Sequence, residues 1–238
     1  MKHLLILALA FTPALAQAAA PRALCAPATL QVSAGATVDP APDRVYIEVG
    51  VRTEAPQPKV AAADNAARIA TMLAAVRKAA GPAAELTTAD YSLAPQYQYS
   101  NTGKPPAITG YVVTNLVRVR LDHLKRIGSV IDAANAAGAN MQQNLRFALR
   151  HPEAARVRAL ALAARRARAA AGALAAALDL RIVRILAVRQ TGGAVRAPSP
   201  MMFGPVLRAQ RMVPATPIES GSLQVSAGVS MTVAVVPR

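Results

Sequence analysis

The sequence predicts an α+β protein with a largely antiparallel sheet and helices packed on one face, in the order ββαββ-αβαββ. Apolar residues alternate with polar ones in several segments, most strictly at Val45, Ile47, Val49 and Val51, which is typical of half-buried strands. Other segments carry apolar residues at helical spacing. Two long strand segments flank a polar stretch at residues 100–106, as in an antiparallel pair.

The remaining elements follow from similar signals. Gly81 and Pro82 end a helix, Asp122 is a good N-cap for the next one, and Pro152 suits the first turn of the longest. Strands are expected at residues 29–38, 45–51, 86–99, 108–121, 140–150, 181–190 and 222–236, and helices at 56–80, 123–138 and 152–178. The longest helix is expected to pack through Val157, Leu160, Ala161, Ala164, Ala171, Leu174, Ala175 and Leu178. Residues 191–217 are rich in Gly, Pro and Met and lack periodicity, which predicts a loop.

One six-residue segment occurs twice. LQVSAG stands at residues 30–35 and again at residues 223–228, in the first and the last expected strands. Either the match is a coincidence among residues that suit strands, or the two strands have similar roles and lie side by side.

The N-terminus resembles a cleaved export signal. Lys2 precedes an apolar run at residues 4–11, which is too short to span a bilayer, and small residues around Ala18 and Ala20 suit a signal peptidase. The expected organisation is a signal peptide at 1–20, a tail at 21–28 and a single domain at 29–238. We therefore expect a periplasmic protein that does not span the membrane. Cys25 follows the cleavage region, but Leu24 before it does not fit a lipidation motif.

Composition excludes several classes of protein. The 238 residues include one Cys and three His, so neither a disulfide framework nor a Cys-based zinc site is expected. Lys and Arg number 27 against 12 acidic residues, for a net charge of +15. The basic side of the longest helix has no aromatic residues between its arginines, so we expect no nucleic-acid partner. An exported basic protein meets anionic lipids and wall polymers instead, and Arg158, Arg165 and Arg166 form a candidate anion-binding face.

The order of motifs resembles the SIMPL-domain family of Gram-negative envelope proteins. The matching segments are VSAGA at 32–36, PDRVYIEVGV at 42–51, NA at 65–66, LTTADYSLAPQY at 86–97, ITGY at 108–111, AAGAN at 136–140, Phe147 and GSLQVSA at 221–227. A Gly-x-Gly usual in the first strand is here Ala34-Gly35-Ala36. The resemblance implies an envelope protein linked to oxidative-stress defence that assembles into large homo-oligomers. It implies no established reaction.

No catalytic constellation, cofactor motif or metal site is expected from the sequence. His123 and His151 are far apart and are predicted to lie in exposed loops. The candidate subunit interface is Met201, Met202, Phe203, Leu207 and Met212. The thioethers of its three methionines could instead bind copper(I) or scavenge oxidants. Three hypotheses follow: a self-assembling, non-enzymatic envelope protein; a module that binds an anionic envelope component; and an enzyme of unrecognised type using the tyrosines of residues 91–99.

Overall fold

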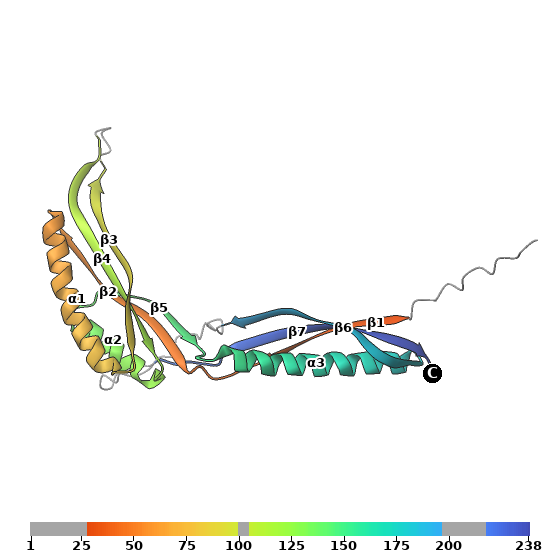
Figure 1. Cartoon of the computed structure of the whole chain (residues 1–238). Helices are drawn as coiled ribbons and strands as arrows, with labels where there is room; N and C mark the ends of the chain where they lie inside the picture. The colour runs from red at the N-terminus through yellow and green to blue at the C-terminus, as the bar shows by residue number, and fades with distance from the viewer. Residues whose placement is uncertain (1–27, 100–104, 197–217) are drawn as a thin grey trace, which may run out of the picture.

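A computed structural model of the chain describes residues 28–99, 105–196 and 218–238 (Figure 1). The elements are β1 (Thr29–Val38), β2 (Arg44–Ala55), α1 (Pro58–Ala80), β3 (Glu85–Gln98), β4 (Ala107–Leu121), a 3-10 turn (Leu124–Arg126), α2 (Ile127–Ala136), β5 (Met141–Ala148), α3 (Pro152–Ala177), β6 (Leu180–Arg196) and β7 (Gln224–Pro237). The α+β class and the predicted element order are confirmed.

The strands form two antiparallel sheets where the sequence led us to expect a single sheet. One sheet has the order β3-β4-β2-β5 and is covered by α1 and α2; we call this unit the four-stranded part. The other has the order β1-β7-β6 and is covered by α3; we call it the three-stranded part. Each sheet keeps its helices on one face. Alternation within a strand predicts which side is buried but not which strands pair, so it could not distinguish one sheet from two.

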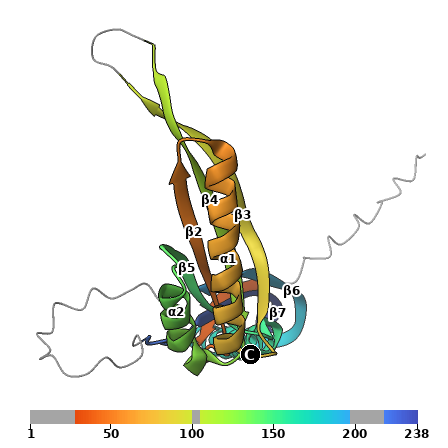
Figure 2. The same ribbon diagram turned by 90° about the vertical axis from the view of Figure 1, so that its left-hand side faces the viewer.

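The two parts are elongated and meet at a bend (Figure 1). Turned by 90°, the molecule shows the β3–β4 hairpin extending past the N-terminal end of α1 (Figure 2). Among the described elements, the chain crosses between the parts after β1 and after β5. Within the described ranges, no helix combines the length and the apolar character needed to cross a membrane.

The core of the four-stranded part is built from branched and long side chains. Val45, Ile47, Val49 and Val51 on β2 are all buried against the helices. Met72 on α1 is completely buried among them. The sequence predicts that this helix packs through Val60, Ala63, Ala67, Met72, Leu73 and Val76. Met72 and Val76 are buried and Leu73 is half-buried, but Val60, Ala63 and Ala67 are exposed, so the prediction was wrong for the N-terminal half of the helix.

A buried amide joins α1 to its sheet. The Asn65 Nδ2 donates to the carbonyl oxygens of Val51 on β2 and Val113 on β4, at 2.9 and 3.4 Å. An asparagine on the buried face of α1 thereby fixes the position of the helix along two strands.

The three-stranded part packs its helix through alanine. The buried residues of α3 recur at every fourth position: Ala155, Ala159, Ala163, Ala167, Ala171 and Ala175. The predicted packing face was therefore wrong in part, since Val157, Leu174 and Leu178 are 64%, 44% and 58% exposed. A stripe of small side chains allows the helix backbone to lie close to β1 and β7, whereas larger residues at these positions would hold it away.

The repeated LQVSAG segments do lie in neighbouring strands. β1 and β7 pair in antiparallel fashion, and Gly35 of the first copy stands directly opposite Gly228 of the second. The two copies meet at these glycines and extend from them in opposite directions along the sheet. At Gly228 a side chain would collide with the backbone oxygen of Thr191 on β6, so this position needs glycine.

Strand β6 continues to Arg196, past Gln190 where we expected it to end. Its glycines have positive φ, 67° at Gly192 and 158° at Gly193, and coincide with a shift in register against β7. A β-bulge here lets the strand resume pairing after two residues that look like loop in the sequence. The rest of the predicted loop, residues 197–217, lies outside the described residues.

Candidate binding site at the bend

The uncovered face of the four-stranded sheet carries a cavity of about 550 Å³ near the bend. Its lining residues are Tyr46 and Glu48 from β2, Arg118 from β4, and Asn144, Leu145 and Arg146 from β5. Strand alternation explains their placement. Because Val45, Ile47 and Val49 face the helices, Tyr46 and Glu48 face the opposite side.

Glu48 is a buried carboxylate with a full set of donors. It stands opposite Arg118 in the β2–β4 register, and its Oε1 accepts from Nη2 and Nε of Arg118 at 2.7 and 3.1 Å. Its Oε2 accepts from the side-chain amides of Asn144 at 2.6 Å and Gln143 at 3.2 Å. These hydrogen bonds, led by that of Arg118, lower the pKa of Glu48 despite its burial.

A bulge in β5 brings the Asn144 amide to Glu48. Tyr46 pairs with Arg146 but Glu48 pairs with Gln143, so β5 contains one residue more than β2 in this interval. Asn144 adopts a positive φ of 56°, a conformation that asparagine tolerates better than most residues. The bulge redirects the side chain toward the carboxylate, as bulges beside functional sites often do.

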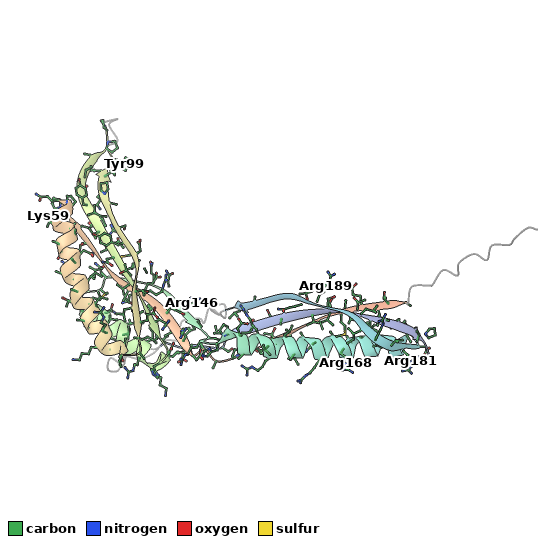
Figure 3. All side chains as sticks on the ribbon, in the orientation of Figure 1. Lys59, Tyr99, Arg146, Arg168, Arg181 and Arg189 are labelled. Atoms are coloured by element: carbon green, nitrogen blue, oxygen red, sulfur yellow. The ribbon has the colours of Figure 1, made fainter. Side chains whose placement is uncertain are left out.

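Arg146 lies over the ring of Tyr46, with the guanidinium carbon 4.8 Å from the ring centroid. This cation–π contact is its sole side-chain interaction within the described ranges, where it makes no ion pair. Figure 3 labels Arg146 where the two parts meet. A guanidinium held over a ring by this contact still has N–H groups that can donate to an acceptor in the cavity.

A second polar network lies where β2 begins and β4 ends. The Arg44 Nε and Nη2 donate to the two carboxylate oxygens of Asp122 at 2.7 and 3.2 Å, and Arg150 also pairs with Asp122 at 3.2 Å. The hydrogen bond from Arg44 lowers the pKa of Asp122. The predicted N-cap role of Asp122 was wrong: a 3-10 turn precedes α2, and neither helix start has a side-chain cap. The arginine pair outcompetes the backbone amides for this carboxylate.

A second cavity, of about 360 Å³, adjoins the first across the bend. It shares Tyr46 and Arg146 with the first cavity and is otherwise lined by Phe147, Ala148, Leu149, Pro152, Arg156, Val195 and Leu223. Residues of β5, α3, β6 and the segment before β7 therefore contribute to it. The two cavities together cross from one part of the molecule to the other.

The arginines predicted to bind anions lie on α3, away from both cavities. Arg158, Arg165 and Arg166 are exposed. Arg166 turns toward the sheet, and its Nη1 donates to the carbonyl of Gly35 at 2.9 Å. Arg158 and Arg165 have no ion-pair partner within the described ranges. The three side chains do not converge on a cavity.

Other sequence predictions have separate outcomes. His123 and His151 are exposed, as expected. Tyr91, Tyr97 and Tyr99 are 56%, 48% and 76% exposed along the β3 side of the hairpin and do not line the cavities at the bend. The predicted signal peptide, Cys25, and the candidate interface at Met201, Met202, Phe203, Leu207 and Met212 lie outside the described residues.

Sequence reasoning missed the polar cluster around Glu48. The strict alternation of β2 marked Glu48 as outward-facing, which for an isolated strand suggests a solvent-exposed side chain. A usable signal was present in Arg118, which is outward-facing on a strand expected to pair in the same sheet. The register that places the two opposite each other, and the bulge that adds Asn144, depend on tertiary pairing.

The comparisons with known proteins agree on one family. The model of the SIMPL family, described as a protein of unknown function (DUF541), matches residues 30–233. The 26 kDa periplasmic immunogenic protein of Brucella melitensis is 27% identical over 205 residues, covering 85% of this chain and 80% of that protein, and the Brucella abortus protein of the same name matches equally. The uncharacterized protein YggE of Edwardsiella ictaluri is 27% identical over 157 residues, covering 66% and 65%. Because the family model spans most of the chain, this protein belongs to the SIMPL family.

Proposed function

We propose that this protein is an exported, periplasmic envelope protein that assembles into a homo-oligomer and acts without catalysis. Two of the relatives are named as periplasmic proteins, and the N-terminal residues resemble an export signal. The observation that carries the assembly is the exposed edge strand β6.

Strand β6 has the properties of a contact surface. It pairs with β7 along one edge, and no described strand pairs with its other edge. It exposes five large apolar side chains: Val183, Ile185, Leu186, Val188 and Val195. Monomeric proteins usually protect such an edge with charges, proline or a covering element. A second copy of the chain would pair the free backbone groups and bury the apolar side chains together.

Light scattering of the mature protein tests the assembly. We expect a mass well above that of one chain at tens of micromolar. Changing Ile185 and Val188 together to Lys places two charges in the proposed contact and is expected to lower the mass. The matched control is Val60→Lys, which adds a charge at an exposed valine of the four-stranded part and should leave the mass unchanged.

The outcomes separate the possible interfaces. A monomeric wild-type chain would refute self-assembly. An unchanged oligomer in the β6 double variant, with unchanged circular dichroism, would remove β6 from the interface. Deletion of residues 200–214 would then test the candidate interface predicted from the sequence.

The proposed biological role is protection of the envelope during oxidative stress, which the family resemblance implies. The proposal includes no reaction and names no catalytic residue. Survival of a strain lacking the gene in hydrogen peroxide, compared with the complemented strain, tests this role. Equal survival of the two strains would contradict it. A β6 double variant that restores survival would separate protection from assembly.

A further inference from the structure

The two cavities at the bend share two of their lining residues. Both are lined by Tyr46 and Arg146, so these two residues form the boundary between them. The first cavity is polar, with Glu48 and Arg118 in its wall. In the second, apolar side chains such as those of Phe147 and Val195 lie beside Arg146 and Arg156. Their volumes, about 550 and 360 Å³, are in the range of small-molecule sites.

The polar cavity carries excess positive charge. Arg118 and Arg146 line it, against one carboxylate, Glu48. Arg156 lines the second cavity and is paired with Glu153 at 2.7 Å. Glu48 already accepts hydrogen bonds from three side chains, so its charge is compensated without Arg146. The Arg118 side chain is half exposed despite its ion pair. A ligand acceptor could therefore reach both Arg118 and Arg146.

The support beneath these arginines is rigid. Arg118 is held by the buried carboxylate of Glu48, and Arg146 lies over the ring of Tyr46. Tyr46 and Arg146 stand opposite each other in the register of β2 and β5. Guanidinium groups that are positioned before binding lose less conformational entropy when a ligand arrives. This distinguishes them from Arg158 and Arg165, which have no such support on α3.

We propose that the two cavities form one binding site for a small anionic amphiphile. The acidic group of the ligand lies against Arg146 and Arg118, and its apolar chain lies against Phe147 and Val195 across the bend. Charge complementarity selects the acidic group, and the adjoining apolar wall selects a ligand with a short hydrocarbon portion over a simple anion. The site lies within a single chain, so the proposal does not depend on self-assembly.

Matched probes test both halves of the site. Octanoate, below its critical micelle concentration, is titrated into the mature protein by calorimetry, alongside octanol and acetate. We expect saturable binding of octanoate, and affinities roughly tenfold or more weaker for octanol, which lacks the charge, and for acetate, which lacks the chain. Octyl phosphate in a parallel titration shows whether the site prefers a carboxylate or a phosphate.

Single variants locate the site. Arg146→Gln is expected to weaken octanoate binding roughly tenfold, because a charge-assisted contact is lost while the hydrogen bonds of Glu48 remain intact. Val195→Ser is expected to weaken it through the apolar half. The matched control is Arg158→Gln, which removes the same charge from an exposed helix position outside both cavities.

Three results would overturn the proposal. One is the absence of saturable octanoate binding to the folded wild-type protein. Another is an equal loss in Arg146→Gln and Arg158→Gln, which would indicate general attraction to a basic surface. The third is unaltered octanoate binding in Arg146→Gln together with a change in oligomer mass, which would make the bend a subunit contact instead.

Discussion

The two parts of the molecule bury their helices in different ways. In the four-stranded part, α1 and α2 cover the sheet through a core rich in valine, isoleucine and leucine, with Met72 at its centre. In the three-stranded part, α3 presents six alanines at intervals of four residues. The first arrangement fills space with side chains, and the second removes space by bringing backbones together. Alanine therefore has a packing role along α3.

The two interfaces should fail in opposite ways. A core of large side chains is sensitive to truncation, because a cavity remains where atoms are removed. An interface of alanines is sensitive to enlargement, because no space exists for added atoms. Substitutions in each direction test whether this contrast is real.

Truncation of Met72 is expected to have the largest effect. Met72→Ala should lower the free energy of unfolding by about 2–5 kcal/mol, since the side chain is completely buried. The control Val60→Ala, at a half-exposed position of the same helix, should cost well under half of this. Urea unfolding measures both. Equal effects at the two positions would show that α1 does not pack as described.

Enlargement of Ala167 is expected to have the next largest effect. Ala167→Leu should cost about 1–3 kcal/mol by forcing α3 away from β1 and β7. The control Ala161→Leu introduces the same side chain at an exposed position of the helix and should be close to neutral. If both variants unfold like the wild type, the alanine stripe does not hold α3 close to the sheet.

Acid should loosen the four-stranded part before the three-stranded part. The pKa values of Glu48 and Asp122 are lowered in the folded state from ordinary values of 4.5 and 3.8. Their contribution to stability is thus fully present above these ordinary values and is lost as the pH falls through the lower folded-state values. Both of these carboxylates belong to the four-stranded part, Glu48 on β2 and Asp122 directly after β4.

Hydrogen exchange at pH 3 to 4, compared with pH 7, measures this difference in acid stability between the two parts. We expect the backbone amides of β2 and β5 to lose protection before those of β7. Glu48→Gln should reduce this acid sensitivity, while Glu54→Gln, which removes an exposed carboxylate from the same strand, should not. Simultaneous loss of protection in all three strands, in wild type and variants alike, would exclude a local effect of these carboxylates.

The sequence predicted local features well and long-range ones poorly. Strand β1 was placed at its observed bounds, and Pro152 does open α3, because alternation and helix-start signals are local. The face of α3 was misjudged because larger apolar residues were expected inside, whereas close backbone approach favours alanine. The cluster around Glu48 joins residues up to 96 positions apart through a register and a bulge. Neither is encoded in the periodicity of any one strand.

The smallest effect is expected on the outer face of α3. Changing Arg158, Arg165 and Arg166 together to Gln should leave the fold intact, because exposed charges contribute about 0–1 kcal/mol each. Arg166 is the one of the three with a described partner, the carbonyl of Gly35, so any measurable loss should come mainly from it. Thermal unfolding of the triple variant and of Arg166→Gln alone separates these contributions.

The same triple variant also tests whether this face binds anions specifically. Attraction to vesicles containing phosphatidylglycerol should weaken and should depend on salt, because exposed charges are screened over about 10 Å at 0.1 M ionic strength. Octanoate binding at the bend should not change. A salt-independent loss of high-affinity vesicle binding in the triple variant would instead make Arg158, Arg165 and Arg166 a specific site. The alanine stripe of α3 would then serve to position those arginines as well as to pack the helix.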